Sequence, residues 1–493
     1  MGRGPRNSTP LSDQDALFLD AESEASPMHV AVVLVFAPGP TTSLRDEAAR
    51  SRIARFLERG LAIDRRYAQR LDHLPLSGRP IWVDDPDFDL DRHVRSRRLP
   101  APGSEAQLRT VCAELVAQPL DRTRPLWEVW LLDGLEGDRF ALLVKVHHCL
   151  VDGVAGIGLM GAILGVAPAS DFESRPLRAS GESPLRAELA LREIRRRVDA
   201  GLELAERGVR ALHDPRGTLR RARRLGRGLR RLVRLDWPPA SRTGLDAPHE
   251  GRRQLAFMAT DLERIEAIRA RWGGTLNDVV VATVDLALQD YLEDHGLDTR
   301  HRRELDLRVA IPVDRRSATE PDGVADRGNH ISMIFARIPS GERSPSRVYA
   351  RVSGALAQAK VSHMAEALEA VMTLAGWSPQ RLTRALTRRA LALHVANLVV
   401  TNVRGPSAPL YLLDAPLERT WPIVPLMPGQ TLAVAVMSYA GRLHWGFHAD
   451  RAGVRDLNHW SILAERAFER LHAEATGSGR HGGAERRGTR LTG

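Results

Sequence analysis

Cysteine is nearly absent from this 493-residue chain, which contains two, Cys112 and Cys149. Two cysteines build neither a disulfide framework nor a cluster of metal ligands, so a reducing, cytoplasmic setting is predicted. Long hydrophobic runs are also lacking. No stretch approaches the roughly 18 uninterrupted apolar residues of a membrane span, and the basic segment Met1–Pro10 lacks the apolar centre of a signal peptide. The sequence therefore predicts a protein that is soluble or peripheral to a membrane.

Acidic residues are fewer than basic ones, 61 against 71, and the formal net charge is +10. The excess suggests an acidic partner, such as nucleic acid, an anionic membrane or a phosphorylated small molecule. The segment Arg216–Arg234 holds nine arginines and no acid, with leucines recurring on one helical face. Such a helix could lie on an anionic membrane, or its leucines could dock on the protein itself. Nucleic acid is not expected, because no aromatic interleaving accompanies the arginines.

The length is sufficient for two domains with large cores, and both halves of the sequence mix strand and helix patterns. We expect a disordered tail over 1–10, a first domain over 11–170 and a basic helical crossover over 171–250. A second domain is expected over 251–475 and a disordered basic tail over 476–493. The crossover is set apart by its many arginines and its few β-branched or aromatic residues.

Periodicity and turn residues predict the individual elements. Ser12 is expected to cap a short helix, and helical patterning runs from Ser43 to about Arg70. Thr260 and Thr275 each precede an acid by three residues, which is the spacing of a capping box at a helix start. Strands are expected at Met28–Phe36, Ile81–Val83, Val129–Leu132, Phe140–Val146, Gln254–Ala259, Leu305–Ile311, Ile331–Ile338, Ala396–Val403, Thr431–Tyr439 and Leu443–His448.

The stretch HHCLVDG, residues 147–153, lies between a strand pattern and a helix pattern, so a strand-to-helix turn is predicted. Neighbouring side chains on an extended chain point to opposite faces, and the two histidines therefore cannot share one role. One of them is a candidate general base that takes a proton from an alcohol, because histidine titrates close to neutral pH. The alternative is a strand end with one buried and one exposed histidine.

Several other residues have a structural interpretation beside the functional one. Metal binding by His147, His148 and Asp152 is disfavoured, because neighbouring histidines rarely reach one ion. Trp127 is expected to be a core residue rather than a ligand contact. The carboxylate of Asp278 can hydrogen-bond back to the chain near Thr275, which would make it a helix cap.

These motifs together resemble the bacterial wax ester synthase/diacylglycerol acyltransferases, a branch of the CoA-dependent acyltransferase superfamily. The resemblance covers about Leu11 to Leu471. The HHxxxDG motif indicates the superfamily, and its combination with PLW and ND indicates this branch. One departure is Arg404, where the family usually has proline. The matching stretches are Pro27-Met28-His29-Val30, Pro125-Leu126-Trp127, His147 to Gly153, Asn277-Asp278, Gly328-Asn329 and Thr401-Asn402-Val403-Arg404-Gly405-Pro406.

The resemblance implies an α/β fold. Two similar chloramphenicol-acetyltransferase-like domains, each a mixed sheet flanked by helices, would be joined by a long helical crossover, with the active-site channel between them. His148 would be the general base, acting on the hydroxyl of diacylglycerol or a long-chain alcohol as it attacks the thioester of acyl-CoA. No covalent acyl-enzyme is required, because both substrates are bound together. His147 would support the base, Asp152 would orient the turn, and Gly153 would allow close packing there.

The remaining motif residues receive supporting roles. Cys149 is the alternative nucleophile, disfavoured because it points away from its histidine neighbour on an extended chain. Asn277 and Asp278 are expected to organise the interface, with Asn277 the candidate donor to an oxyanion. The excess of basic residues is expected to bind the phosphates of CoA, and no bound cofactor or metal is implied. The products would be triacylglycerol or wax esters, made at the inner face of the plasma membrane or on lipid bodies.

Two other functions are considered. One is a superfamily enzyme that uses a carrier-protein thioester or another acceptor, and the PLW and ND motifs argue against it. The other is a non-catalytic lipid-binding or membrane-organising protein, and the intact HHxxxDG motif argues against that.

Overall fold

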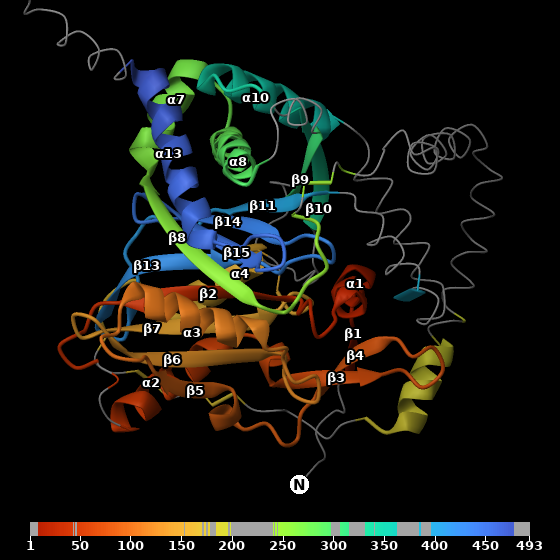
Figure 1. The fold of residues 1–493 in the computed structure, drawn as a ribbon. Helices are drawn as coiled ribbons and strands as arrows, with labels where there is room; N and C mark the ends of the chain where they lie inside the picture. The colour runs from red at the N-terminus through yellow and green to blue at the C-terminus, as the bar shows by residue number, and fades with distance from the viewer. Residues whose placement is uncertain are drawn as a thin grey trace, which may run out of the picture.

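Two six-stranded mixed sheets, one above the other in Figure 1, form the centre of the molecule. The structure is a computed structural model. Its described residues are 8–195, 198, 240–296, 306–314, 331–339, 341–361, 384–385 and 396–477, apart from short gaps at 43, 45–46, 152, 170–171, 174–175, 178–183, 241 and 244. The predicted helix Arg216–Arg234 and the motif residues Asp152, Gly328 and Asn329 lie outside the described residues.

The first sheet has the order β12-β13-β2-β7-β6-β5, and only β5 and β6 pair in parallel. One face packs on α2 (Glu47–Leu61) and α4 (Gly153–Ile163), and the other face packs on α3 (Glu105–Ala117). Alternate strand residues supply these two cores, as the period of two requires. The strands are β12 (Tyr411–Leu412), β13 (Ala415–Ile423), β2 (His29–Phe36), β7 (Arg139–His147), β6 (Trp127–Leu135) and β5 (Val94–Arg98).

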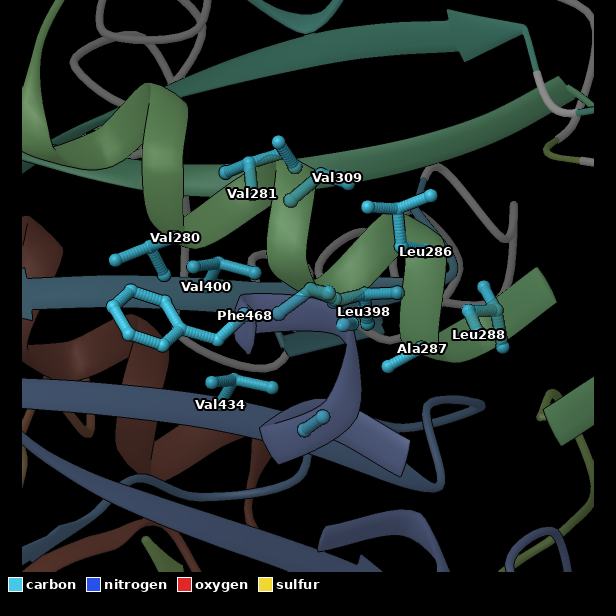
Figure 2. Close-up of a cluster of buried hydrophobic side chains, with 14 of the residues drawn as sticks. Val280, Val281, Leu286, Ala287, Leu288, Val309, Leu398, Val400, Val434 and Phe468 are labelled. Carbon is cyan, nitrogen blue, oxygen red and sulfur yellow. The ribbon is translucent and has the colours of Figure 1, made fainter. Parts of the chain in front are cut away.

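The second sheet has the order β10-β9-β11-β14-β15-β8 and is covered by four helices. Residues 278–292 of one helix, α8, are buried almost without exception. Most of them are apolar, and the buried polar pair Asp285 and Gln289 is joined by a hydrogen bond. Figure 2 shows its valines and leucines packed against strand residues such as Val400 and Val434 and against Phe468. The elements are β10 (Ile331–Pro339), β9 (Asp306–Asp314), β11 (Leu398–Val403), β14 (Leu432–Tyr439), β15 (Arg442–Asp450), β8 (Arg253–Asp261), α7 (Leu262–Trp272), α8 (Leu276–Asp294), α10 (Pro345–Val361) and α13 (Leu457–Thr476).

A small third sheet and a short helix stand beside the first sheet. The helix α1 (Asp13–Ala21) is capped by Ser12, whose Oγ accepts a hydrogen bond from the Asp15 N–H, as predicted. Ser8–Pro10, within the range predicted as a tail, forms a strand. The order of this sheet is β1-β4-β3, built from β1 (Ser8–Pro10), β4 (Pro80–Asp84) and β3 (Gln69–His73), and the short 3-10 helices are η1 (Arg65–Ala68) and η2 (Leu90–Arg92).

The two halves of the chain are joined through the first sheet. β13 comes from the second half of the sequence but pairs antiparallel with β2. Phe257 of β8 stacks on Trp421 of β13 with ring centroids 4.9 Å apart, and α3 packs against β8. The domain bounds inferred from the sequence stay a prediction. Residues 411–423, which fall in the range predicted for the second domain, form strands of the first sheet.

Two predicted elements differ from the structure. The helix expected from Ser43 to Arg70 ends at Leu61, and the last part of that range instead forms η1 and begins β3, where pairing with β4 overrides helical patterning. Thr260 does not begin a helix. It is the next-to-last residue of β8, and its Oγ1 accepts a hydrogen bond of 3.0 Å from the indole of Trp445. The predicted helix is present as α7, with Asp261 as its N-cap. The predicted strands, including the β6–β7 hairpin, are present.

Candidate active site

The stretch HHCLVDG forms the predicted strand-to-helix turn, between the end of β7 at His147 and the start of α4 at Gly153. Backbone hydrogen bonds hold the turn from both neighbouring segments. The His147 N–H donates to the Leu126 carbonyl at 3.0 Å, and the His148 N–H donates to the Met28 carbonyl at 2.9 Å. The PLW and PMHV motifs therefore both contact the histidine turn through their backbone.

The two histidines have different surroundings, as the alternation predicted. The side chain of His147 is fully buried, whereas His148 is partly exposed. The imidazole of His148 stacks on the ring of Phe18 in α1, with centroids 4.0 Å apart and planes 4° from parallel. The stack fixes the plane of the His148 ring and shields one of its faces from water.

Both ring nitrogens of His147 face the protein. Nδ1 accepts a hydrogen bond of 3.1 Å from the Cys149 N–H, and Nε2 lies 3.4 Å from Oε1 of Glu22. A nitrogen that accepts a backbone N–H carries no proton itself, so the proton of this neutral imidazole is on Nε2 and faces the carboxylate. His147 is thus held in one tautomer by its two neighbours.

Glu22 follows α1, and its side chain is 6% exposed. Oε1 accepts a hydrogen bond of 3.0 Å from the Met28 N–H, and Oε2 accepts from Arg122 Nε at 2.8 Å and Nη2 at 2.5 Å. Burial by itself raises the pKa of Glu22, but the hydrogen bond and charge of His147, Arg122 and the Met28 N–H together lower it to about 2. The carboxylate is therefore ionised at neutral pH.

The turn lies beside the second sheet. His29 of β2 pairs directly with His147 of β7. Burial holds the pKa of His29 well below its usual value, and Lys145, His147 and His448 of β15 lower it further. Because β15 belongs to the second sheet, the histidine turn is located where the two halves of the chain meet.

Cys149 is buried and 1% exposed. Burial, with Asp15 and Glu22 nearby, raises the pKa of its thiol well above the ordinary value. A thiol in such a site stays protonated at neutral pH, and the thiolate is the nucleophilic form. These surroundings are unsuited to nucleophilic catalysis.

Trp127 of the PLW motif is a core residue, as expected. It is 1% exposed, its indole N–H donates to the Tyr67 carbonyl at 2.8 Å, and its ring stacks on His93 with centroids 4.6 Å apart. Leu126 is fully buried beside it. The contact between this motif and the histidine turn is the Leu126 carbonyl, not the indole.

Asn277 and Asp278 begin α8. Oδ2 of Asp278 accepts a hydrogen bond of 2.6 Å from the Thr275 N–H, the predicted capping contact. Oδ1 of Asn277 accepts a bond of 2.9 Å from Nδ2 of Asn402 in β11. The structure thus brings together the ND motif and the stretch Thr401–Pro406. Arg404, the departure from the family pattern, is exposed in that stretch.

Sequence reasoning missed Phe18, Glu22 and Arg122 as parts of the site. Their only local signal is that Phe18 and Glu22 are four residues apart, just ahead of the PMHV motif. Among the residues that the structure describes, no group of three or more His, Cys, Asp or Glu side chains is arranged to hold a metal ion. Within the same described ranges, no helix is long and apolar enough to cross a membrane.

Comparison with known proteins identifies the family. A model described as the wax ester synthase/diacylglycerol acyltransferase catalytic domain matches residues 11–280, more than half of the chain. The chain belongs to this family. A model of the C-terminal domain of wax ester synthase/diacylglycerol acyltransferases matches residues 327–472. The family predicted from the motifs is confirmed, and so is the predicted enzyme class, an acyltransferase.

Relatives match nearly the whole chain. A protein of Mycobacterium tuberculosis named "Probable diacyglycerol O-acyltransferase tgs1" is 30% identical over 468 residues, covering 94% of this chain and 96% of that protein. The solved wax ester synthase/diacylglycerol acyltransferase of Marinobacter aquaeolei superposes with a TM-score of 0.67 at 24% identity, covering 95% of this chain and 100% of that one. A starter condensation domain of rhizomide synthetase, solved with C8-CoA, has a TM-score of 0.55 at 14% identity over 95% and 94% of the two chains. These likenesses confirm the predicted fold class.

Proposed function

We propose that this acyltransferase moves a long-chain acyl group from acyl-CoA to diacylglycerol, to a long-chain alcohol, or to both, with His148 as general base. The observation that carries the proposal is the division between the two histidines. His147 is fully buried and uses both ring nitrogens on the protein, whereas His148 is partly exposed on the same turn. His148 is therefore the histidine of this motif that can reach a substrate hydroxyl.

The reaction follows from that placement. His148 takes the proton of the acceptor hydroxyl as its oxygen attacks the thioester carbonyl, and a tetrahedral intermediate forms. The intermediate then collapses, the carbon–sulfur bond breaks, and the proton passes from His148 to the departing CoA thiolate. The buried, protonated thiol of Cys149 favours this direct transfer over an acyl-enzyme.

Asn277 is the candidate donor to the oxyanion of that intermediate. Its Oδ1 accepts from Asn402, and this bond orients the amide so that its N–H groups point elsewhere. Asp278 acts as a helix cap and Trp127 as a core residue. In this proposal Asp152 and Gly153 shape the turn, and arginines bind the phosphates of CoA.

The test is an assay of the purified protein with palmitoyl-CoA and either dipalmitoylglycerol or hexadecanol, following CoA release and lipid products. We expect His148→Ala to lose about 100-fold or more in kcat, as removal of a general base does, and Cys149→Ala to keep wild-type activity. Equal rates for wild type and His148→Ala would overturn the assignment, and an acylated Cys149 in trapped enzyme would overturn direct transfer. Turnover with acyl carrier protein thioesters alone would instead support the condensation-type alternative, and no turnover with any donor would support a lipid-binding role.

We also propose that the enzyme contacts an anionic membrane or lipid-body surface, where its apolar substrates reside. A described part of the crossover supports this. Three apolar side chains on residues 186–198, Leu191, Ile194 and Val198, are each about half exposed or more and recur at helical spacing. Exposed arginines at 186, 192 and 195 lie on the same segment, which suits an anionic lipid surface.

Vesicle flotation tests the membrane proposal. The double variant Leu191→Ser, Ile194→Ser should bind vesicles of phosphatidylglycerol and phosphatidylcholine more weakly than wild type. The control Ile462→Ser, at an exposed position on α13, should bind them as strongly as wild type. Deletion of Arg216–Arg234 tests the contribution of the basic segment in the same assay. Unchanged binding in the Leu191/Ile194 double variant and in the deletion variant would rule out the crossover as the membrane contact.

A further inference from the structure

Three separate supports of His148 converge on one residue, Glu22. The His148 N–H is held by the Met28 carbonyl, and the N–H of the same Met28 donates to Oε1 of Glu22. The His148 ring is held by Phe18, and the Phe18 carbonyl accepts from the Glu22 N–H at 3.2 Å. The backbone of the proposed base is therefore linked to Glu22 through Met28, and its ring is linked to the Glu22 backbone through Phe18.

The third support passes through His147. Oε1 of Glu22 faces Nε2 of His147, and Nδ1 of the same ring accepts the Cys149 N–H. This fixes the peptides on either side of His148, because His147 and Cys149 are its two neighbours in the chain. A neutral group at position 22 could not accept from Met28, His147 and Arg122 with equal strength, since hydrogen bonds to an ionised acceptor are roughly twice as strong.

We propose that Glu22 is a positioning residue, whose carboxylate sets the backbone of the His148 turn for proton transfer, with Arg122 as its counter-ion. The inference rests on the proposed function, in which His148 is the base. Glu22 touches neither substrate nor reacting atoms in this role. Its carboxylate acts through Met28 and His147, whereas the backbone N–H that holds the Phe18 carbonyl is kept in side-chain variants. Loss of the carboxylate is therefore expected to slow the chemical step and to leave substrate binding in place.

Glu22→Gln tests this at nearly constant volume. The amide carbonyl can still accept from Met28, but the amide N–H₂ meets the donors of Arg122, so the side chain is expected to turn away. We expect kcat to fall by about 10- to 100-fold, with the KM for palmitoyl-CoA within about twofold of wild type. Glu24→Gln, an exposed acid two residues further on, is the matched control and should keep the wild-type kcat.

A second readout follows the turn itself. Both cysteines of the chain are buried, so slow labelling by a thiol reagent is expected in wild type. Glu22→Gln should speed the labelling of Cys149, located by peptide mass, and leave that of Cys112 unchanged. If Glu22→Gln does not fold, Glu22→Asp replaces it. The shorter carboxylate keeps the charge but cannot span all three donors, and a lower kcat at unchanged KM is again expected.

The outcomes separate this inference from the function on which it rests. A folded Glu22→Gln enzyme with wild-type kcat, or a Glu22→Asp enzyme with wild-type kcat, overturns the positioning role while an inactive His148→Ala leaves the base assignment intact. A fully active His148→Ala overturns the base assignment itself. A Glu22 variant that changes KM in proportion to kcat also contradicts positioning, because it indicates a direct contact with substrate.

Discussion

Asn402 of β11 donates a hydrogen bond of 2.9 Å from Nδ2 to Oδ1 of Asn277, at the start of α8 and 125 residues away in the chain. The bond fixes the orientation of the Asn277 amide, with its oxygen toward β11. It links two motifs that the sequence presents as unrelated.

Asn402→Ala removes that donor and should lower activity more than stability. We expect a loss of roughly 1 kcal/mol in unfolding free energy, the usual worth of one hydrogen bond. If Asn277 donates to the oxyanion, kcat should fall by about tenfold or more, since loss of one such donor costs about 100-fold. Steady-state kinetics and urea unfolding measure the two effects. Asn458→Ala, an amide on α13 that accepts from Arg109, is the control, and an unaltered kcat in Asn402→Ala would argue against the oxyanion role.

Trp127→Phe should weaken the fold without altering catalysis. The indole N–H that bonds the Tyr67 carbonyl is lost, together with part of the packing on His93. A buried carbonyl left without its donor costs about 1–3 kcal/mol. Urea unfolding should show this loss, while the kcat of the folded enzyme stays near wild type. A raised KM for acyl-CoA at unchanged stability would show instead that the indole contacts substrate.

Gly405→Ala should destabilise the protein. The Gly405 N–H donates to Ser438 Oγ at 3.1 Å, and a Cβ at this position would collide with the Ser438 carbonyl oxygen. Overpacking of this kind costs about 1–3 kcal/mol, to be measured by urea unfolding. Gly354→Ala in α10 is the matched control. A Cβ there meets open space, so a neutral effect or a gain of up to about 1 kcal/mol is expected. Equal stabilities of the two variants would contradict this account of Gly405.

Stability should fall as the pH drops from 7 to 5, partly through His448. Burial, together with the charges of Arg253 and His249, lowers the pKa of His448 to about 3, against the opposing effects of the Val424 carbonyl and Asp450. The imidazole of His448 takes up a proton near pH 6.5 in the unfolded chain but only near pH 3 in the folded chain. Its neutral form therefore adds its full share to the unfolding free energy above pH 6.5, and this share is lost as the pH falls toward 3. At pH 5 this loss of unfolding free energy amounts to about 2 kcal/mol.

His448→Asn tests that assignment, because its amide can replace the Nδ1 bond of 2.7 Å to the Val424 carbonyl. The variant should show a smaller loss of unfolding free energy between pH 7 and pH 5 than wild type. His73→Asn, an exposed histidine in β3, should leave the pH dependence unchanged. Identical slopes for wild type and His448→Asn would mean that other buried histidines carry the effect.

Local patterns predicted what depends on local chemistry. The β6–β7 hairpin, the turn at His147 and the cap at Ser12 follow from alternation, turn residues and cap spacing, and all three are present. β13 was missed. Its sequence contains Pro416 and Pro422, which disfavour a strand, and it forms by pairing with β2.

In the candidate site, too, the features set by local sequence could be predicted, and those set by distant residues could not. His147 and His148 could be separated by alternation, since that is a property of the strand itself. Glu22 could not be found, because its burial depends on Arg122 and His147, each at least 100 residues away. A buried carboxylate and a solvated one look the same in a single sequence.

The pairing of β13 with β2 has a consequence for synthesis of the chain. About 380 residues separate the two strands, so β2 emerges from the ribosome long before its partner. At about 5–20 residues per second, the outer edge of the nascent sheet stays open for about 20–80 s. An unpaired edge of valine and leucine invites association with other chains. Expression of the first 170 residues alone is therefore expected to yield aggregates, and co-expression with the second half should rescue solubility.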